Sequence, residues 1–193
     1  MPEGTTTRTP PVRINLRLAL EVPRWALACY IHRFALVAGI SLVPAAERFA
    51  VALWGDALSL PAHIALEVIA EGSRVVLVFL LVRLAILRDE RVLRWEHLKA
   101  GRRIRAFLNR RWPSLLLQGA FLIALVIVFD VIPERIVPLW ISASAEDLYW
   151  ALLLATKNVT VIAFTLIWMV AAVRQMLIEG GRLLEEPPEP DRA

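Results

Sequence analysis

One stretch decides the fold class: residues 113–132 read PSLLLQGAFLIALVIVFDVI. Between Arg111 and Asp130 the chain carries no charged side chain over eighteen residues. A helix needs about 20 mostly apolar residues to cross a hydrocarbon core of roughly 30 Å. The stretch therefore predicts a membrane-spanning helix.

Three further segments, each interrupted by charges, are also predicted to span: 25–44, 61–87 and 148–173. The composition agrees, with 58% hydrophobic and 21% charged residues and a mean hydropathy of +0.59. Soluble domains contain only about 45–50% apolar residues, which argues against the alternative of a soluble helical bundle. We predict an all-α, polytopic membrane protein with four transmembrane helices in a bundle.

Lysine and arginine residues predict the orientation of the bundle. Sixteen of them lie in the N-terminal segment, the loop 88–112 and the C-terminal tail. Only Arg48 and Arg135 lie in the other two loops, 45–60 and 133–147. Because short cytoplasmic loops are enriched in these residues, we predict a multi-pass protein of the inner (cytoplasmic) membrane with both termini in the cytoplasm.

The membrane domain, residues 25–173, is flanked by two short cytoplasmic segments. Residues 1–24 begin with a Thr- and Pro-rich stretch that we predict to be disordered. Residues 12–22 alternate apolar and polar side chains, as strands do, but their composition favours a helix. We expect an interfacial helix there, with a strand that pairs with another subunit as the alternative. Residues 174–193 form an acidic, proline-rich tail.

The loop 88–112 is the most basic part of the chain. Its apolar side chains recur at spacings of three and four, which places them on one face of a helix. We predict an amphipathic cytoplasmic helix that lies on the leaflet and contacts anionic lipid; a plain topology signal is the alternative. No nucleic-acid-binding module accompanies the charge, so no nucleic-acid partner is expected. The predicted lipid-surface residues are Lys99, Arg102, Arg103, Ile104, Phe107 and Arg110.

Ionisable side chains inside spans are costly and mark a candidate site. Counting along the helices at about 1.5 Å per residue places Arg33, Glu71 and Lys157 at one level near the midplane. Glu67, Glu71 and Arg74 share one helix face, which we expect to point into the bundle. We predict that Glu71 can pair with Lys157 in an intramembrane polar cluster of Arg33, Glu67, Glu71, Arg74, Lys157 and Asn158.

This cluster has three interpretations: an ionic lock that fixes helix register, a path for protons, ions or a substrate, or a site that pairs with charges on another protein's helix. No metal, cofactor or catalytic residue is predicted. The three histidines fall at different levels, Cys29 stands alone, and no nucleophile, phosphate-loop or dinucleotide motif occurs.

Two classes of function follow from this organisation. The first is an accessory or scaffolding subunit of a larger membrane assembly. It is favoured because the chain has no dedicated soluble module, no broken-helix binding motif and no repeated half. The second is a small oligomeric channel or transporter that uses the cluster as its path. The expected partners are membrane lipids, including anionic lipid at the cytoplasmic face, and partner subunits or further copies of the chain.

Overall fold

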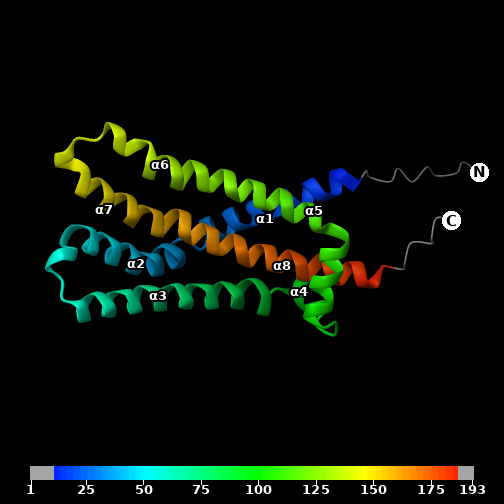
Figure 1. The fold of residues 1–193 in the computed structure, drawn as a ribbon. Helices are drawn as coiled ribbons and strands as arrows, with labels where there is room; N and C mark the ends of the chain where they lie inside the picture. The colour runs from blue at the N-terminus through cyan, green and yellow to red at the C-terminus, as the bar shows by residue number, and fades with distance from the viewer. Residues whose placement is uncertain (1–10, 187–193) are drawn as a thin grey trace, which may run out of the picture.

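The computed structural model describes residues 11–186, and within this range the chain forms helices and no strand (Figure 1). Three π-helical turns, Arg83–Leu87, Ile127–Val131 and Asn158–Ile162, directly continue α3, α5 and α7. Short 3-10 turns lie at Gly55–Ala57, Val137–Trp140 and Ala143–Ala145. The α-helices are α1 (Pro11–His32), α2 (Phe34–Trp54), α3 (Leu60–Val82), α4 (Glu90–Leu93), α5 (Ala100–Val126), α6 (Ile132–Arg135), α7 (Glu146–Lys157) and α8 (Ala163–Glu185).

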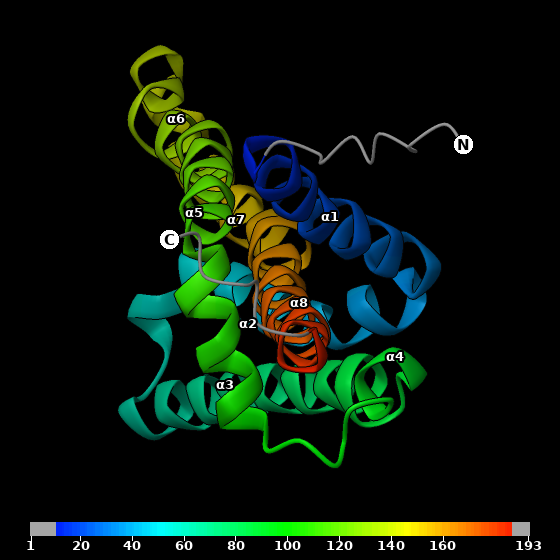
Figure 2. The ribbon, with the colours of Figure 1, turned by 90° about the vertical axis from the view of Figure 1, so that its right-hand side faces the viewer.

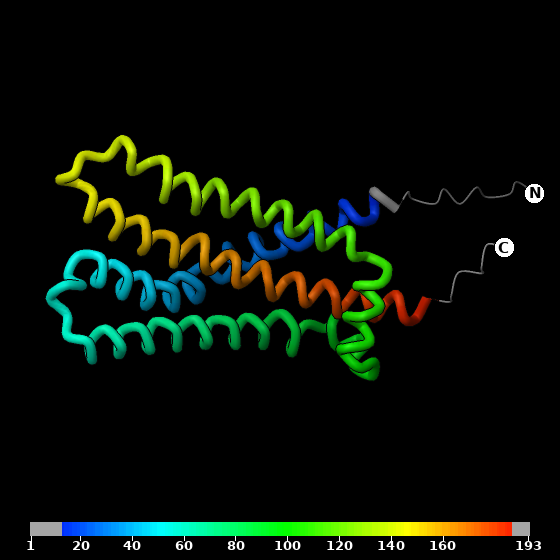
Figure 3. The backbone as a smooth tube through the Cα atoms, viewed as in Figure 1, coloured from blue at the N-terminus to red at the C-terminus, as the bar shows by residue number. Residues whose placement is uncertain are grey.

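α1 and α2 run one after the other from one end of the bundle to the other, and α3 returns beside α2 (Figures 1 and 3). α5 and the α7–α8 segment then run out and back in the same way. The start of α1, the α4 turn, the start of α5 and the end of α8 lie at one end of the bundle, and the α2–α3 and α6–α7 connections lie at the other. Seen along the bundle, α8 lies among the other helices and contacts α1, α3 and α5 (Figure 2). The buried core accordingly includes Leu77 and Leu81 of α3 with Ile167 and Trp168 of α8.

In the described part of the chain, residues 11–186, three helical segments are long and apolar enough to cross a membrane: Phe34–Ala57, Ala100–Trp140 and Ala143–Glu185. Over residues 11–186 the prediction of an all-helical protein is therefore confirmed, as is the prediction of helices able to cross a membrane by length and composition. The stretch 113–132 lies within the second segment. The second predicted span, 61–87, corresponds to α3, which is not among these three segments. It carries Glu67, Glu71 and Arg74 within its length.

The first predicted span, 25–44, is wrong as a single helix. The chain breaks at Arg33, so α1 ends at His32 and α2 continues to Trp54, through the residues expected to form the first outer loop. Pro44, the last residue of the predicted span 25–44, lies inside α2. Proline removes one backbone hydrogen bond, but neighbouring helices let membrane helices tolerate it. Pro44 is fully buried among such neighbours.

The first residues of α1 are helical, which excludes the strand alternative. Leu18, Ala19, Val22 and Ala26 form the buried face of α1, and their spacing is that of one side of a helix. The Gln175 amide donates to the Leu18 carbonyl (2.7 Å), which ties α1 to α8. Residues 1–10, most of the stretch predicted to be disordered, and 187–193 of the acidic tail lie outside the described residues.

The separate amphipathic helix expected in the loop 88–112 is not present. After the short α4, residues 100–112 are the first turns of α5, which runs on through Pro113 into the apolar stretch. These first turns cross the end of the bundle before the helix bends into the bundle direction (Figures 1 and 2). Pro113 lies inside α5, directly after these turns, and prolines are a common cause of helix bends.

The apolar face of these turns is also rotated relative to the prediction. Phe107 is fully buried and Arg103 is 4% exposed, so neither contacts a lipid surface as predicted. The Arg103 guanidinium donates to the carbonyls of Val92, Trp95 and Leu177 at 2.8–3.3 Å, and so joins the α4 region to α8. Lys99, Arg102 and Arg110 are exposed, and Ile104 is half-buried.

Two consecutive glycines let α8 cross α5 at close range. A Cβ atom at Gly180 would lie 1.9 Å from the Arg103 carbonyl oxygen, and one at Gly181 would lie 2.7 Å from the Trp95 ring. Neither position has room for a larger residue unless the backbone of α5 or the indole moves. The same end of α8 is held by Arg174, which pairs with Asp89 (2.7 Å) and lies over the Trp25 ring.

Candidate functional site

Lys157, at the end of α7, is the centre of the first charged group. Its side chain is 9% exposed, and its ammonium contacts the carboxylates of Asp130 and Glu134, the latter at 2.5 Å. Asp130 lies in the π turn that follows α5, and Glu134 lies in α6. The two acids are four residues apart, so both reach the same side of this helical segment. The lysine thus joins α7 to the end of the α5–α6 segment.

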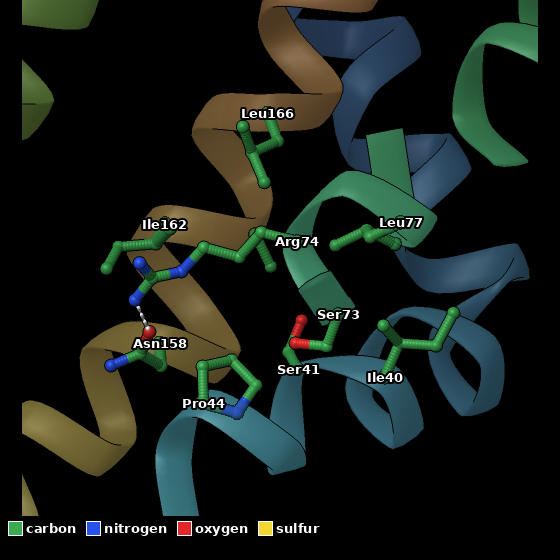
Figure 4. A pocket seen from close by; sticks show the side chains of 10 residues that line it. Ile40, Ser41, Pro44, Ser73, Arg74, Leu77, Asn158, Ile162 and Leu166 are labelled. Carbon is green, nitrogen blue, oxygen red and sulfur yellow. Dashed lines mark hydrogen bonds between the residues drawn. The ribbon is translucent and has the colours of Figure 1, made fainter. Parts of the chain in front are cut away.

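The second charged group lies beside the first and joins α3 to the π turn after α7 (Figure 4). The Arg74 guanidinium donates to the Asn158 side-chain oxygen at 2.7 Å and also pairs with Glu71. The Asn158 amide in turn donates to the Leu154 carbonyl (2.9 Å), which fixes its orientation. Asn158 is 4% exposed, so this hydrogen-bonded contact lies inside the bundle.

A small cavity adjoins Arg74 and Asn158 between α2, α3 and α8 (Figure 4). The volume of this cavity is about 10 Å³, which is about the minimum that one water molecule needs. Pro44, Ser41 and Ser73 also line it. The cavity can hold a single water molecule and is too small for an organic ligand.

A third charged group joins α2 to α3. The Arg48 guanidinium donates to Glu67 at 3.0 Å and lies 3.2 Å from the Glu47 carboxylate. The Glu47 side chain is 4% exposed, whereas that of Glu67 is 52% exposed. Arg48 therefore connects a buried acid of α2 with an acid on the surface of α3.

The first two groups together form a continuous polar line across the bundle, because Lys157 and Asn158 are consecutive residues with contacts to different helices. Lys157 contacts the α5–α6 segment, and Asn158 contacts α3. We call this line the charged belt; its members are Asp130, Glu134, Lys157, Asn158, Arg74 and Glu71. Interactions of this kind fix the register of neighbouring helices, and they also supply proton-binding groups at one level.

The structure brings together only part of the predicted cluster. Glu71, Arg74 and Asn158 are in direct contact, and Glu67 lies one turn away on α3 with Arg48 as its partner. The predicted pairing of Lys157 with Glu71 is replaced by contacts with Asp130 and Glu134. The electrostatic stabilisation of a lysine by two closely spaced acids is larger than its stabilisation by one acid that already has an arginine partner.

Arg33 does not belong to the belt. It lies exposed at the break between α1 and α2 and forms no ion pair with any residue in the described range 11–186. The level calculated for it assumed a straight helix from residue 25, and the break invalidates that count.

Sequence reasoning missed four charged residues of these groups: Glu47, Arg48, Asp130 and Glu134. Two signals could have revealed them. Asp130 and Glu134 have the i, i+4 spacing of one helix face, but Pro133 directly follows the predicted span 113–132, and proline commonly ends a helix. Glu47 and Arg48 directly follow Pro44 and therefore fall in the predicted loop 45–60.

Two of the three π turns coincide with the charged belt: Ile127–Val131 contains Asp130, and Asn158–Ile162 begins with Asn158. Such turns are rare in helices and are frequent at functional sites. Over residues 11–186, no group of three His, Cys, Asp or Glu side chains is placed to hold a metal ion. The side chains of the belt offer ion pairing, hydrogen bonding and proton binding.

No protein-family model, curated protein or solved structure matches this chain. Its class is defined by its own fold and site: over residues 11–186 it is all-helical, with three helices able to cross a membrane and a charged belt between its helices.

Proposed function

We propose that this chain is a four-span inner-membrane protein that acts as a subunit of a larger membrane assembly and meets its partner through α3. One observation carries the proposal. The side chains of Glu67 and Glu71 are each 52% exposed on a helix that lies along an apolar, membrane-length segment.

The depth of these acids follows from their neighbours on α2. Arg48 lies nine residues before the end of the segment Phe34–Ala57, or about 14 Å from it along a helix. Glu67 contacts Arg48 and therefore lies at a similar depth, with Glu71 one turn further in. Both acids would then lie within a hydrocarbon core of roughly 30 Å.

Lipid is a poor environment for these side chains. A charged side chain at the bilayer centre costs about 2.5–3.5 kcal/mol even on the more permissive scales. For two half-exposed carboxylates, contact with another polar surface is therefore lower in free energy than contact with acyl chains. We call the exposed face of α3 that carries Glu67, Glu71 and Gly72 the α3 strip.

The charge of the α3 strip and its neighbours favours a partner different from this chain. Glu47, Glu67 and Glu71 outnumber Arg48 and Arg74 by one negative charge. Two such strips from two copies would repel each other, whereas a helix that carries a lysine or arginine would complement the strip. A second protein with a basic intramembrane residue is therefore the proposed partner.

The four-span arrangement and its orientation are supported by the antiparallel order of the helices (Figure 1). The start of α1, the α4 region and the end of α8 lie at the same end of the bundle, and most arginines and lysines belong to these parts of the chain. By the positive-inside rule this end is cytoplasmic. In this arrangement α3 is the second span.

A small oligomeric channel or transporter is the second candidate function. The observation that favours it is the coincidence of two π turns with the charged belt. In that case the α3 strips of several copies would surround a water-filled path, and the acids would bind the passing cation or proton.

The two candidates can be separated by purification from native membranes in a mild detergent. We expect the wild-type chain to retain a stoichiometric second protein, and the Glu67→Gln, Glu71→Gln double variant to lose most of it. The Glu146→Gln, Asp147→Asn variant is the matched control, because both of its acids are exposed at the end of the bundle; it should retain the partner. A lone homo-oligomer that passes ions in liposomes would favour the channel, and a monomer without partner or conductance would contradict both.

A further inference from the structure

A groove lies where α5 begins and α8 ends, outside the charged belt and the α3 strip. Its volume is about 340 Å³. Its α5 side is one helix face with spacings of three and four, and its α8 side is apolar. The lining residues are Arg102, Arg105, Ala106, Asn109 and Arg110 from α5, and Leu183 and Leu184 from α8.

The three arginines of this groove differ from other arginines at the same end of the protein. Arg103 is buried with three carbonyl acceptors, and Arg174 pairs with Asp89. In contrast, Arg102, Arg105 and Arg110 are exposed, and within residues 11–186 none of them forms an ion pair. The groove therefore carries three guanidinium groups that are not neutralised by any described carboxylate.

The position of the groove suits a lipid headgroup better than a ligand from bulk water. The first turns of α5 cross the end of the bundle (Figure 2), and the long uncharged stretch begins directly after Arg111. Trp112 is 56% exposed at this transition, and tryptophan is enriched at membrane–water interfaces. The arginines thus lie beside the level at which phosphate groups of the leaflet are found.

From this geometry we infer that the groove binds one anionic phospholipid of the cytoplasmic leaflet. The arginines hold the phosphate group, because guanidinium groups form paired, charge-assisted hydrogen bonds with phosphate oxygens. The Asn109 side chain supplies a further polar contact for the headgroup, and Leu183 and Leu184 contact the start of the acyl chains. The inference does not depend on a protein partner at the α3 strip.

This site differs from general attraction between a basic surface and anionic lipid. General attraction depends on the number of charges near the leaflet and is similar for any of them. A groove site depends on Arg102 and Arg105 and not on arginines elsewhere at the same end. Arg88 and Arg91 are exposed in the neighbouring connection and do not line the groove, so they provide a control of equal charge.

The test is native mass spectrometry of the purified full chain in neutral detergent with added phosphatidylglycerol or phosphatidylcholine. We expect a one-to-one phosphatidylglycerol adduct and little phosphatidylcholine adduct. The Arg102→Gln, Arg105→Gln variant should weaken the adduct by about tenfold or more, since it removes two charge-assisted contacts. The Arg88→Gln, Arg91→Gln variant should stay within about twofold of wild type, as expected for general electrostatics.

Circular dichroism should give the same helix content and melting temperature for both variants, because all four side chains are exposed. Should the groove variant unfold, Arg110→Gln alone must weaken the adduct. Equal losses in the groove and control variants would overturn the site. Displacement of the lipid by excess inorganic phosphate would identify a free-anion site and overturn the lipid assignment.

Discussion

Replacing Gly180 by alanine should destabilise the protein more than any other single-methyl change considered for this chain. The added Cβ would lie 1.9 Å from the Arg103 carbonyl oxygen and 2.5 Å from its carbon. These are backbone atoms, so no rotamer change can relieve the clash, and α8 must move away from α5. Overpacking in a well-packed interior costs about 1–3 kcal/mol and occasionally more, and we expect a loss at or above the upper end of this range.

The movement of α8 would also disrupt the interactions of Arg103. Its guanidinium bonds the Leu177 carbonyl one turn before Gly180, and buried charged groups that lose partners are costly. The measurement is thermal unfolding in detergent. Gly119→Ala is the matched control, since a Cβ at that position meets no atom within 4 Å. It should be neutral or gain up to about 1 kcal/mol from the better helix propensity of alanine. Similar melting temperatures for the two variants would contradict the close crossing of α5 and α8.

Lys157→Met should have the second large effect. It removes the cation between Asp130 and Glu134 and leaves two neighbouring carboxylates without a partner. Breaking a buried pair from one side costs about 3–5 kcal/mol. Because both acids are about one-third exposed, solvent or headgroups will reduce the cost, and we expect roughly half of that range.

A triple variant tests the assignment of the partners. Adding Asp130→Asn and Glu134→Gln to Lys157→Met removes the unbalanced charge and should restore most of the lost stability. Adding Glu71→Gln instead should not restore it, since Glu71 pairs with Arg74. Arg135→Met, at an exposed neighbouring position, is the control and should change stability by less than about 0.5 kcal/mol. Rescue by Glu71→Gln alone would reinstate the pairing that the sequence predicted.

The sequence predicts the helical class of this protein well because the signal is long and uncharged. The run around 113–132 favours a membrane-spanning helix over a soluble one, and the apolar residues of α8 give a second strong signal. Helix ends are predicted poorly, because Pro44, Pro113 and Pro133 lie at or next to the bounds of the predicted spans, whereas each lies within a helix. Tertiary packing compensates for the missing backbone hydrogen bond, and that packing is not visible in a local pattern.

The candidate site was predicted only in part, because a local pattern reveals residue types and does not reveal tertiary contacts. The residue types on α3 and around Lys157 were recognised because charges in apolar segments are conspicuous. Their pairing was not, since it depends on where each helix breaks or bends and on the π turns that shift residues around the helix axis. The contact of Gly180 with the α5 backbone had no counterpart in the sequence analysis, because a close approach requires knowledge of both helices.

The exposed α3 strip at membrane depth is the central claim, and a photo-crosslink from Gly72 in native membranes tests it most directly. Gly72 lies beside Glu71, and a Cβ at this position meets no atom within 4 Å, so a benzophenone side chain can be introduced there without displacing the helix. Leu116 of α5 is 63% exposed and serves as the lipid-facing control. We expect irradiation to give one discrete protein adduct from position 72 and none from position 116. Lipid adducts alone from both positions would contradict the claim that the α3 strip meets a protein partner.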